Sequence, residues 1–142
     1  MKKLIINTDG AARGNPGPAA ASFVVADENG QILIEESAYL GVATNNEAEY
    51  LAVKNALEKI FNDRTHFLPA DVEVRSDSLL VVSQLLGKYK VKNERMRAFY
   101  IQIKELQEKI GNVEYSHVPR EQNARADSLG NKVLDSVSTT KG

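Results

Sequence analysis

The sequence lacks cysteine and tryptophan altogether among its 142 residues. Without cysteine, disulfides, thiolate zinc sites and cysteine nucleophiles are all excluded. Long apolar runs are also lacking, so neither a membrane span nor a signal-peptide core is expected, and a cytoplasmic protein is the default interpretation. The formal net charge is only −1, so nucleic acid could be attracted by a local basic patch but not by the molecule as a whole.

What is present is typical of an ordinary globular domain. Hydrophobic residues make up 42% and charged residues 26% of the chain. This length suits one domain, which we expect over residues 1–137, followed by a flexible C-terminal tail over residues 138–142. One local patch does exist: the basic segment, residues 88–97, has five basic residues against a single acid, Glu94. The solvated start of a helix would give the same pattern, and the sequence does not separate the two interpretations.

The periodicity of apolar residues predicts an α/β fold. Three strands are expected at 3–9, 19–27 and 31–40, and the tight-turn signal at 27–30 makes them an antiparallel meander. Helical spacing follows at 47–61, 78–86, 93–110 and 123–137, with short strands at 72–77 and 113–118. Because strand-helix-strand units require parallel crossovers, this order predicts a mixed sheet covered by helices.

Four carboxylates stand where strand or helix ends could bring them together: Asp9, Glu49, Asp77 and Asp127. Asp9 is expected in a Gly/Pro-rich loop after the first strand, since an unpaired buried carboxylate is costly. Asp77 ends a strand that a right-handed crossover would place parallel to the first, and open α/β sheets collect their active sites at that edge. Each acid taken alone is better explained as a cap or a surface charge.

The coincidence of the four acids favours a metal site. Crowded carboxylates repel one another, so such a cluster is stable only when cations neutralise it. A set of oxygen ligands without cysteine indicates Mg²⁺, or Mn²⁺ as a substitute, and excludes a thiolate zinc site. Two such ions roughly 4 Å apart are the arrangement used in phosphodiester hydrolysis.

Four motifs, in order along nearly the whole chain, resemble those of the ribonuclease H family, type 1, which hydrolyses the RNA strand of RNA/DNA hybrids. They are Thr8-Asp9-Gly10 with Gly14-Asn15-Pro16-Gly17-Pro18, Thr44-Asn45-Asn46-Glu47-Ala48-Glu49, Ser76-Asp77-Ser78, and Asn123-Ala124-Arg125-Ala126-Asp127. The resemblance implies a five-stranded mixed sheet, its first three strands antiparallel, flanked by about four helices. It also implies two Mg²⁺ ions held by Asp9, Glu49, Asp77 and Asp127, and products with 5′-phosphate and 3′-hydroxyl ends.

The same resemblance implies the substrate contacts. Asn15, Thr44 and Asn45 should touch the hybrid, with Thr44 and Asn45 near a phosphate of the DNA strand, where donors beside a helix N-terminus suit an anion. Asn46 and the Gly14-Asn15 backbone are candidates for recognising the RNA 2′-hydroxyl. Helix capping is the alternative for the asparagines, and we expect Asn45 or Asn46 to cap.

Two departures from the best-known family pattern stand out. The long basic protrusion with tryptophans is missing, and the short basic segment, with Lys90, Lys92 and Asn93 as substrate-binding candidates, resembles the compact branch of the family. The mobile histidine near the scissile phosphate also has no clear counterpart. His117 falls inside a strand pattern and is expected to be structural, so Arg120 is the candidate for a phosphate contact or for product release.

The leading hypothesis is therefore a metal-dependent endoribonuclease acting on RNA/DNA hybrids, expected as a monomer without membrane contacts. The alternative is a noncatalytic nucleic-acid-binding module on the same fold, although such modules normally lose one or more of the acids. A related nuclease acting on DNA junctions or double-stranded RNA is a third hypothesis, because the fold alone does not exclude it.

Overall fold

The computed structural model describes residues 2–139 of the chain. Within this range the strands form one five-stranded sheet in the order β3-β2-β1-β4-β5. The strands are β1 (Lys3–Ala12), β2 (Gly17–Asp27), β3 (Ile32–Ala43), β4 (Asp71–Ser76) and β5 (Val113–His117). The helices are α1 (Asn45–Asn62), α2 (Arg64–Phe67), α3 (Leu79–Leu85), α4 (Glu94–Ile110), the 3₁₀ helix η1 (Arg120–Asn123) and α5 (Ala124–Thr139).

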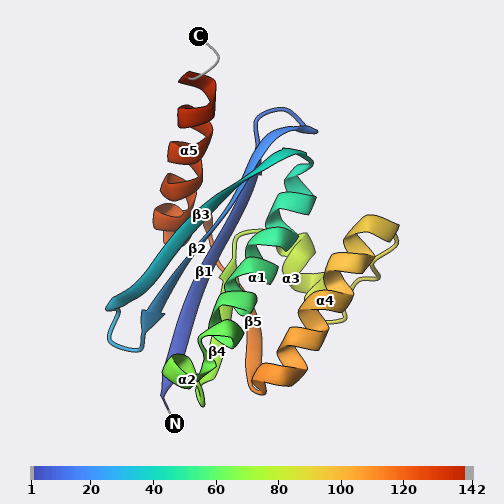
Figure 1. Cartoon of the computed structure of the whole chain (residues 1–142). Helices are drawn as coiled ribbons and strands as arrows, with labels where there is room; N and C mark the ends of the chain where they lie inside the picture. Colours follow the sequence, from blue (N-terminus) through green and yellow to red (C-terminus); the bar gives the residue numbers. More distant parts are fainter. Residues whose placement is uncertain (1, 140–142) are drawn as a thin grey trace.

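The sheet is mixed, as the sequence predicts. β1, β2 and β3 form an antiparallel meander, whereas β4 pairs parallel to β1 and β5 pairs parallel to β4. α1 connects the meander to β4, and α1, α3 and α4 lie on one side of the sheet while α5 lies on the other (Figure 1). β1 is therefore the central strand, with β2 and β4 as its two neighbours.

The main core lies between the sheet and α1. Alternate residues of β1, Leu4 and Ile6, are 2% and 0% exposed because successive side chains of a strand point to opposite faces. Val53, Ala56 and Ile60 of α1 are fully buried against them, at the helical spacing that the sequence predicts. Burial of each large aliphatic side chain contributes about 1.5–3 kcal/mol, so this contact fixes α1 firmly on β1 and β2.

The helix caps agree with the sequence in position but not in every residue. Asn93 caps α4 by accepting a hydrogen bond from the Met96 amide at 3.0 Å, as the sequence predicts for a helix beginning there. The N-cap of α1 is Thr44, and Asn45 and Asn46 are the first two residues of the helix. The expectation that Asn45 or Asn46 caps α1 is wrong, because Thr44 already accepts the capping hydrogen bond.

Two short helical turns were not expected from the sequence. α2 follows α1 directly, and η1 precedes α5, in regions where polar residues mask any periodicity. α5 itself continues to Thr139, two residues beyond the expected end of the domain at 137. The remainder of the expected flexible tail, residues 140–142, lies outside the described residues. Among residues 2–139, the helices are all too short or too polar to cross a membrane.

Candidate active site

The end of the β1–β4 pairing creates the site. The parallel register runs from Lys3–Asp71 to Thr8–Ser76 and stops there, whereas β1 continues to Ala12 along β2. Asp9 is thus the first residue of β1 beyond the end of β4, and Asp77 directly follows β4. The prediction that these two carboxylates share the carboxyl edge of parallel neighbours is confirmed by this register.

Asp9 itself differs from its prediction in one respect. It lies inside β1, paired with Ser22 of β2, and not in the Gly/Pro-rich loop, and it is only 7% exposed. The expectation that it avoids burial is wrong, because β1 extends beyond the end of β4 and α1 packs over this part of the strand. Burying this carboxylate nevertheless costs free energy, and that cost appears as a raised pKa of the Asp9 carboxyl group.

Gly10 allows α1 to approach β1 closely at this point. A Cβ atom at Gly10 would lie 2.1 Å from the backbone carbonyl carbon of Ala48, a distance that real side chains do not adopt. The Gly10 amide donates a hydrogen bond to Oε1 of Glu49, and Ser76 Oγ lies 3.4 Å from its Oε2. Glu49, 7% exposed, is therefore fixed from both strands that flank the site.

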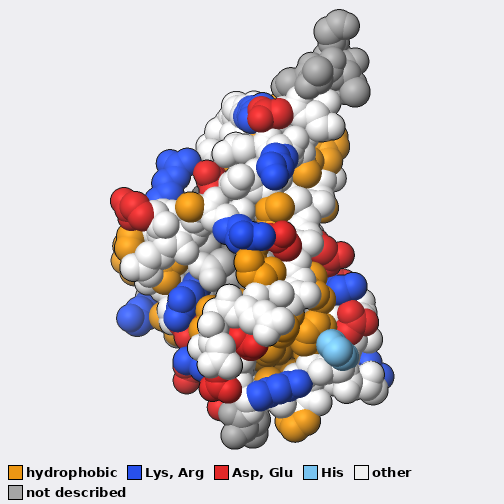
Figure 2. Space-filling view, turned by 90° about the vertical axis from the view of Figure 1, so that its left-hand side faces the viewer, with side chains coloured by type: hydrophobic (Ala, Val, Ile, Leu, Met, Phe, Trp, Pro, Cys, Tyr) orange, Lys and Arg blue, Asp and Glu red, His pale blue; other side chains and the backbone are white. Residues whose placement is uncertain are grey.

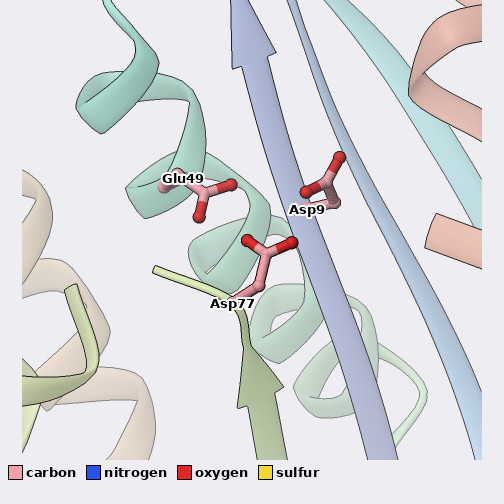
Figure 3. A group of neighbouring side chains, drawn as sticks. All are labelled: Asp9, Glu49 and Asp77. Atoms are coloured by element: carbon pink, nitrogen blue, oxygen red, sulfur yellow. The ribbon is translucent and has the colours of Figure 1, made fainter. Parts of the chain in front are cut away.

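Asp9, Glu49 and Asp77 form what we call the acidic cluster. Each contributes one carboxylate oxygen to a group in which all these oxygens lie within 4.8 Å of one another. Figure 3 shows the three side chains approaching one another from β1, from α1 and from the end of β4. Asp127, in the first turn of α5, stands outside this group of three but lines the same hollow.

Burial and mutual repulsion shift the protonation of the cluster. Desolvation, followed by the charges of Asp77 and Asp127, raises the pKa of Asp9 from 3.8 to about 7. Desolvation, followed by the charge of Asp9, raises the pKa of Glu49 from 4.5 to about 8. The hydrogen bonds from Gly10 and Ser76 oppose the shift at Glu49 without cancelling it. Both groups therefore favour a proton, or another cation, at neutral pH.

The donor set fits a hard divalent cation. The acidic cluster offers carboxylate oxygens only, which are the ligands that Mg²⁺ and Mn²⁺ prefer. Beside the cluster, Arg120 pairs with the fourth acid, since its Nη2 lies 3.9 Å from Oδ1 of Asp127. Since that side chain is 81% exposed, it leaves the charge of the buried cluster largely uncompensated.

The four acids open into a hollow of about 350 Å³. Asn45 and Asn46 line it from the first turn of α1, and Arg120 lines it from η1, so three predicted substrate contacts lie beside the acids. A larger hollow, of about 540 Å³, lies at the opposite ends of β1 and β4. Size therefore does not single out the site, whereas the convergence of four carboxylates does.

The other predicted contacts of the glycine-rich loop are close to α1. Oδ1 of Asn15 accepts a hydrogen bond from the Asn45 amide at 3.0 Å, and Oδ1 of Asn45 accepts one from the Ala12 amide at 2.9 Å. Gly14 has a φ of 95°, a left-handed conformation that favours glycine, which lets the loop turn back toward the helix. The loop is thus tied to the N-terminus of α1, with Thr44 next to it.

The basic segment is farther from the acids. Lys90 and Lys92 line a separate hollow of about 480 Å³. The segment is nevertheless anchored, because Val91 is buried and the carbonyl of Lys90 accepts a hydrogen bond from Nε2 of Gln84 at 3.1 Å. Gln84 in turn accepts a hydrogen bond from the buried Tyr50 hydroxyl at 2.5 Å. Both lysine side chains are exposed, so the core holds their backbone and leaves their charges in solvent.

His117 and Arg120 occupy the edge of the site. His117 is the last residue of β5, and its Nε2 lies 3.3 Å from the carbonyl oxygen of Asp77, beside the cluster. Arg120 begins η1 and reaches the hollow through its exposed guanidinium. These positions leave Arg120 as the candidate for a phosphate contact and His117 as a support for the Asp77 backbone.

Sequence reasoning assigned no role to Asn123, which the structure places at a central point. Asn123 is 1% exposed and donates a hydrogen bond to the Thr8 carbonyl at 2.7 Å, while its Oδ1 accepts one from Asn7 at 3.1 Å. It therefore fixes the start of α5, and with it Asp127, to the central strand. The sequence offered one signal for this role: Asn123 stands four positions before Asp127 in the same motif.

A mixed sheet in this order, with carboxylates converging where β1 outruns β4, defines the ribonuclease H-like class of fold. Residues 7–133 match a family model described as reverse transcriptase-like. Ribonuclease HI of Halobacterium salinarum is 42% identical over 127 residues, which are 89% of this chain and 62% of that protein. The chain belongs to the ribonuclease H family, type 1.

Solved structures agree with this assignment. LC11-RNase H1 in complex with an RNA/DNA hybrid is 44% identical with a TM-score of 0.90, over 94% of this chain and 98% of that one. The N-terminal RNase H domain of Rv2228c from Mycobacterium tuberculosis is 34% identical with a TM-score of 0.91, and each chain is covered completely. The chain spans 62% of the Halobacterium protein and 36% of the whole mycobacterial bifunctional protein.

Proposed function

We propose that the protein is a metal-dependent endoribonuclease that hydrolyses the RNA strand of RNA/DNA hybrids. The observation that carries the proposal is the convergence of three carboxylates within 4.8 Å at the carboxyl edge of β1 and β4. The hybrid-bound LC11-RNase H1, 44% identical over almost the whole chain, supports the choice of substrate.

The four acids hold the metal in this proposal. Asp9, Glu49, Asp77 and Asp127 would bind two Mg²⁺ ions, with Mn²⁺ as a possible substitute, since their oxygens suit hard cations. The bound ions would supply activation of the attacking water and stabilisation of the leaving 3′-oxygen. A new bond forms between the water oxygen and phosphorus while the bond to the 3′-oxygen breaks, which gives 5′-phosphate and 3′-hydroxyl ends.

The remaining residues position the hybrid. Thr44 and Asn45 at the N-terminus of α1 suit a phosphate of the DNA strand, where the helix dipole favours negative charge. Asn46 and the Gly14-Asn15 backbone suit the RNA strand, where a 2′-hydroxyl distinguishes RNA from DNA. Lys90, Lys92 and Asn93 extend the contacts along the duplex, and Arg120 lies beside the acids, where a scissile phosphate or a departing product would pass.

Further parts of the proposal follow from this substrate. The cytoplasm is the proposed location. A single copy contains all four acids and the proposed hybrid contacts, which is compatible with a monomer. Residues 1–137 are proposed as one catalytic domain.

The test is the cleavage of matched labelled duplexes, RNA/DNA, RNA/RNA and DNA/DNA, with Mg²⁺, with Mn²⁺ and with chelator. Metal-dependent cutting of the hybrid alone is expected, and both Asp9→Asn and Asp77→Asn should abolish it while the circular dichroism spectrum stays unchanged. Full activity in either variant would contradict the metal assignment. Hybrid binding without any cleavage would move the protein to the class of noncatalytic binding modules.

A further inference from the structure

Glu47, in the first turn of α1, carries a charge that its structural role does not require. It is 8% exposed, and its Oε1 accepts a hydrogen bond from the Thr44 amide at 3.0 Å. The Glu47 amide donates in return to Thr44 Oγ1 at 3.1 Å, which completes a capping box. A glutamine at this position would make the same box without a charge. The burial of a carboxylate here needs another explanation.

The second oxygen of Glu47 supplies that explanation. Oε2 is fully buried and accepts no hydrogen bond within residues 2–139, but it lies 2.5 Å from Nε of Arg95, in the first turn of α4. The Arg95 side chain is 71% exposed, whereas that of Glu47 is 10% exposed. The ion pair therefore holds the guanidinium by its inner nitrogen and leaves its terminal nitrogens in solvent, without a recorded partner in the described part of the chain.

The position of Arg95 points to an anion. The N-termini of α1 and α4 face the same way (Figure 1), and Arg95 bridges them. Thr44 and Asn93, the two N-caps, stand at the same ends, so two helix dipoles favour negative charge there. A guanidinium held at Nε presents its two terminal nitrogens side by side, which matches two oxygens of a phosphodiester.

We propose that Arg95 binds a backbone phosphate of the nucleic-acid duplex, and that Glu47 is the positioning residue that orients its guanidinium. The inference rests on the proposed function and adds two residues to the substrate contacts. On the α5 side of the molecule, Figure 2 shows basic and acidic side chains interspersed. The duplex would thus lie across the N-termini of α1 and α4, beside the acidic cluster.

The test compares Arg95→Ala, Glu47→Gln, the double variant and a charge-matched control, Arg64→Ala. Arg64 is exposed in α2, where its guanidinium lies over Phe61, away from the acids. Hybrid cleavage with Mg²⁺ gives KM and kcat at several salt concentrations, and fluorescence anisotropy in chelator gives the affinity without cleavage. Glutamine preserves the capping box, and thermal unfolding verifies that each variant is folded.

Arg95→Ala should raise KM about fivefold with kcat unchanged, as expected for one exposed ionic contact. The slope of log affinity against log salt should fall by about 0.9, the value for one phosphate contact on a duplex. Glu47→Gln should raise KM by about two- to threefold, because Arg95 keeps its charge but loses its orientation. The double variant should match Arg95→Ala, since Glu47 acts only through Arg95.

Several results would overturn the inference. A KM for Arg95→Ala equal to that of Arg64→Ala would show that no contact is made. An unchanged salt slope would exclude a phosphate as the partner. A lower KM in Glu47→Gln, or recovery of wild-type KM in the double variant, would show that Arg95 merely neutralises Glu47. If the wild type neither binds nor cuts a hybrid, the proposed function itself fails, and the inference fails with it.

Discussion

Replacing Asp9 with asparagine should stabilise the metal-free protein, and the gain should grow with pH. The pKa of Asp9 is raised from 3.8 to about 7 by burial and by the neighbouring acids. Between these values the folded protein retains a proton that the unfolded chain has already released. The free energy of unfolding therefore falls as pH rises through this window and stays low above it. Asparagine is neutral throughout and avoids this loss.

The size of the effect follows from the width of the window. A shift of about 3 pKa units corresponds to about 4 kcal/mol at pH 9, where Asp9 is ionised in both states. At pH 5 only about one unit of the window has been crossed, which corresponds to about 1.5 kcal/mol. Because the Asp9 and Glu49 carboxyl groups titrate as an interacting pair, these values are ceilings, and we expect a gain of about 2–4 kcal/mol at pH 9.

The assay is urea unfolding followed by circular dichroism at pH 5 and pH 9 in chelator, for the wild type, Asp9→Asn and the control Glu28→Gln. Glu28 is exposed in the turn between β2 and β3, so its neutralisation should change little at either pH. Added Mg²⁺ should then stabilise the wild type more than Asp9→Asn, since ligand binding to the folded state adds stability. A gain that is equal at the two pH values, or a loss at pH 9, would refute the reasoning.

Three further predictions concern the frame of the site. Asn123→Ala leaves the Thr8 carbonyl without its buried donor and should lower the free energy of unfolding by about 1–3 kcal/mol, measured by urea unfolding, with Asn29→Ala in the exposed turn between β2 and β3 as the control. Gly10→Ala places a Cβ against the Ala48 backbone, so it should displace α1 and abolish hybrid cleavage; retained activity would contradict the close approach. The Mg²⁺ concentration for half-maximal cleavage should fall as pH rises from 6 to 9, because protons compete for the acidic cluster, and a pH-independent value would contradict the raised pKa values.

Local patterns predicted the elements, and the topology that follows from them predicted the meeting of the acids. The spacing of Val53, Ala56 and Ile60 predicted the buried stripe of α1, and the order of strands predicted the parallel pairing of β1 with β4. The predictions that failed depended on the exact lengths of the strands and on which of several neighbouring residues caps a helix. β1 outruns β4, which buries Asp9 inside a strand, and Thr44 takes the capping role that was assigned to an asparagine.

Contacts between segments that are distant in the chain could not be predicted from the sequence. The Glu47–Arg95 pair joins residues of two helices that become neighbours only when α1 and α4 pack together. The capping box between Thr44 and Glu47 uses one carboxylate oxygen of Glu47, and the partner of the other oxygen comes from a distant part of the chain. Asn123 belongs to one of the four motifs, but the hydrogen bond that it donates to the Thr8 carbonyl depends on how η1 packs against β1.

The buried acids lower the stability of the fold. They are held by neutral hydrogen-bond donors, which leaves their charge available to a cation. Glu49 is fixed by the Gly10 amide and by Ser76, donors that orient a carboxylate without neutralising it. Had a lysine or arginine been buried among these acids, the pKa values would fall and the fold would gain stability, but the charge would already be compensated. The raised pKa values of Asp9 and Glu49 are therefore the energetic counterpart of metal affinity. A variant that relieves the repulsion should gain stability and lose activity together.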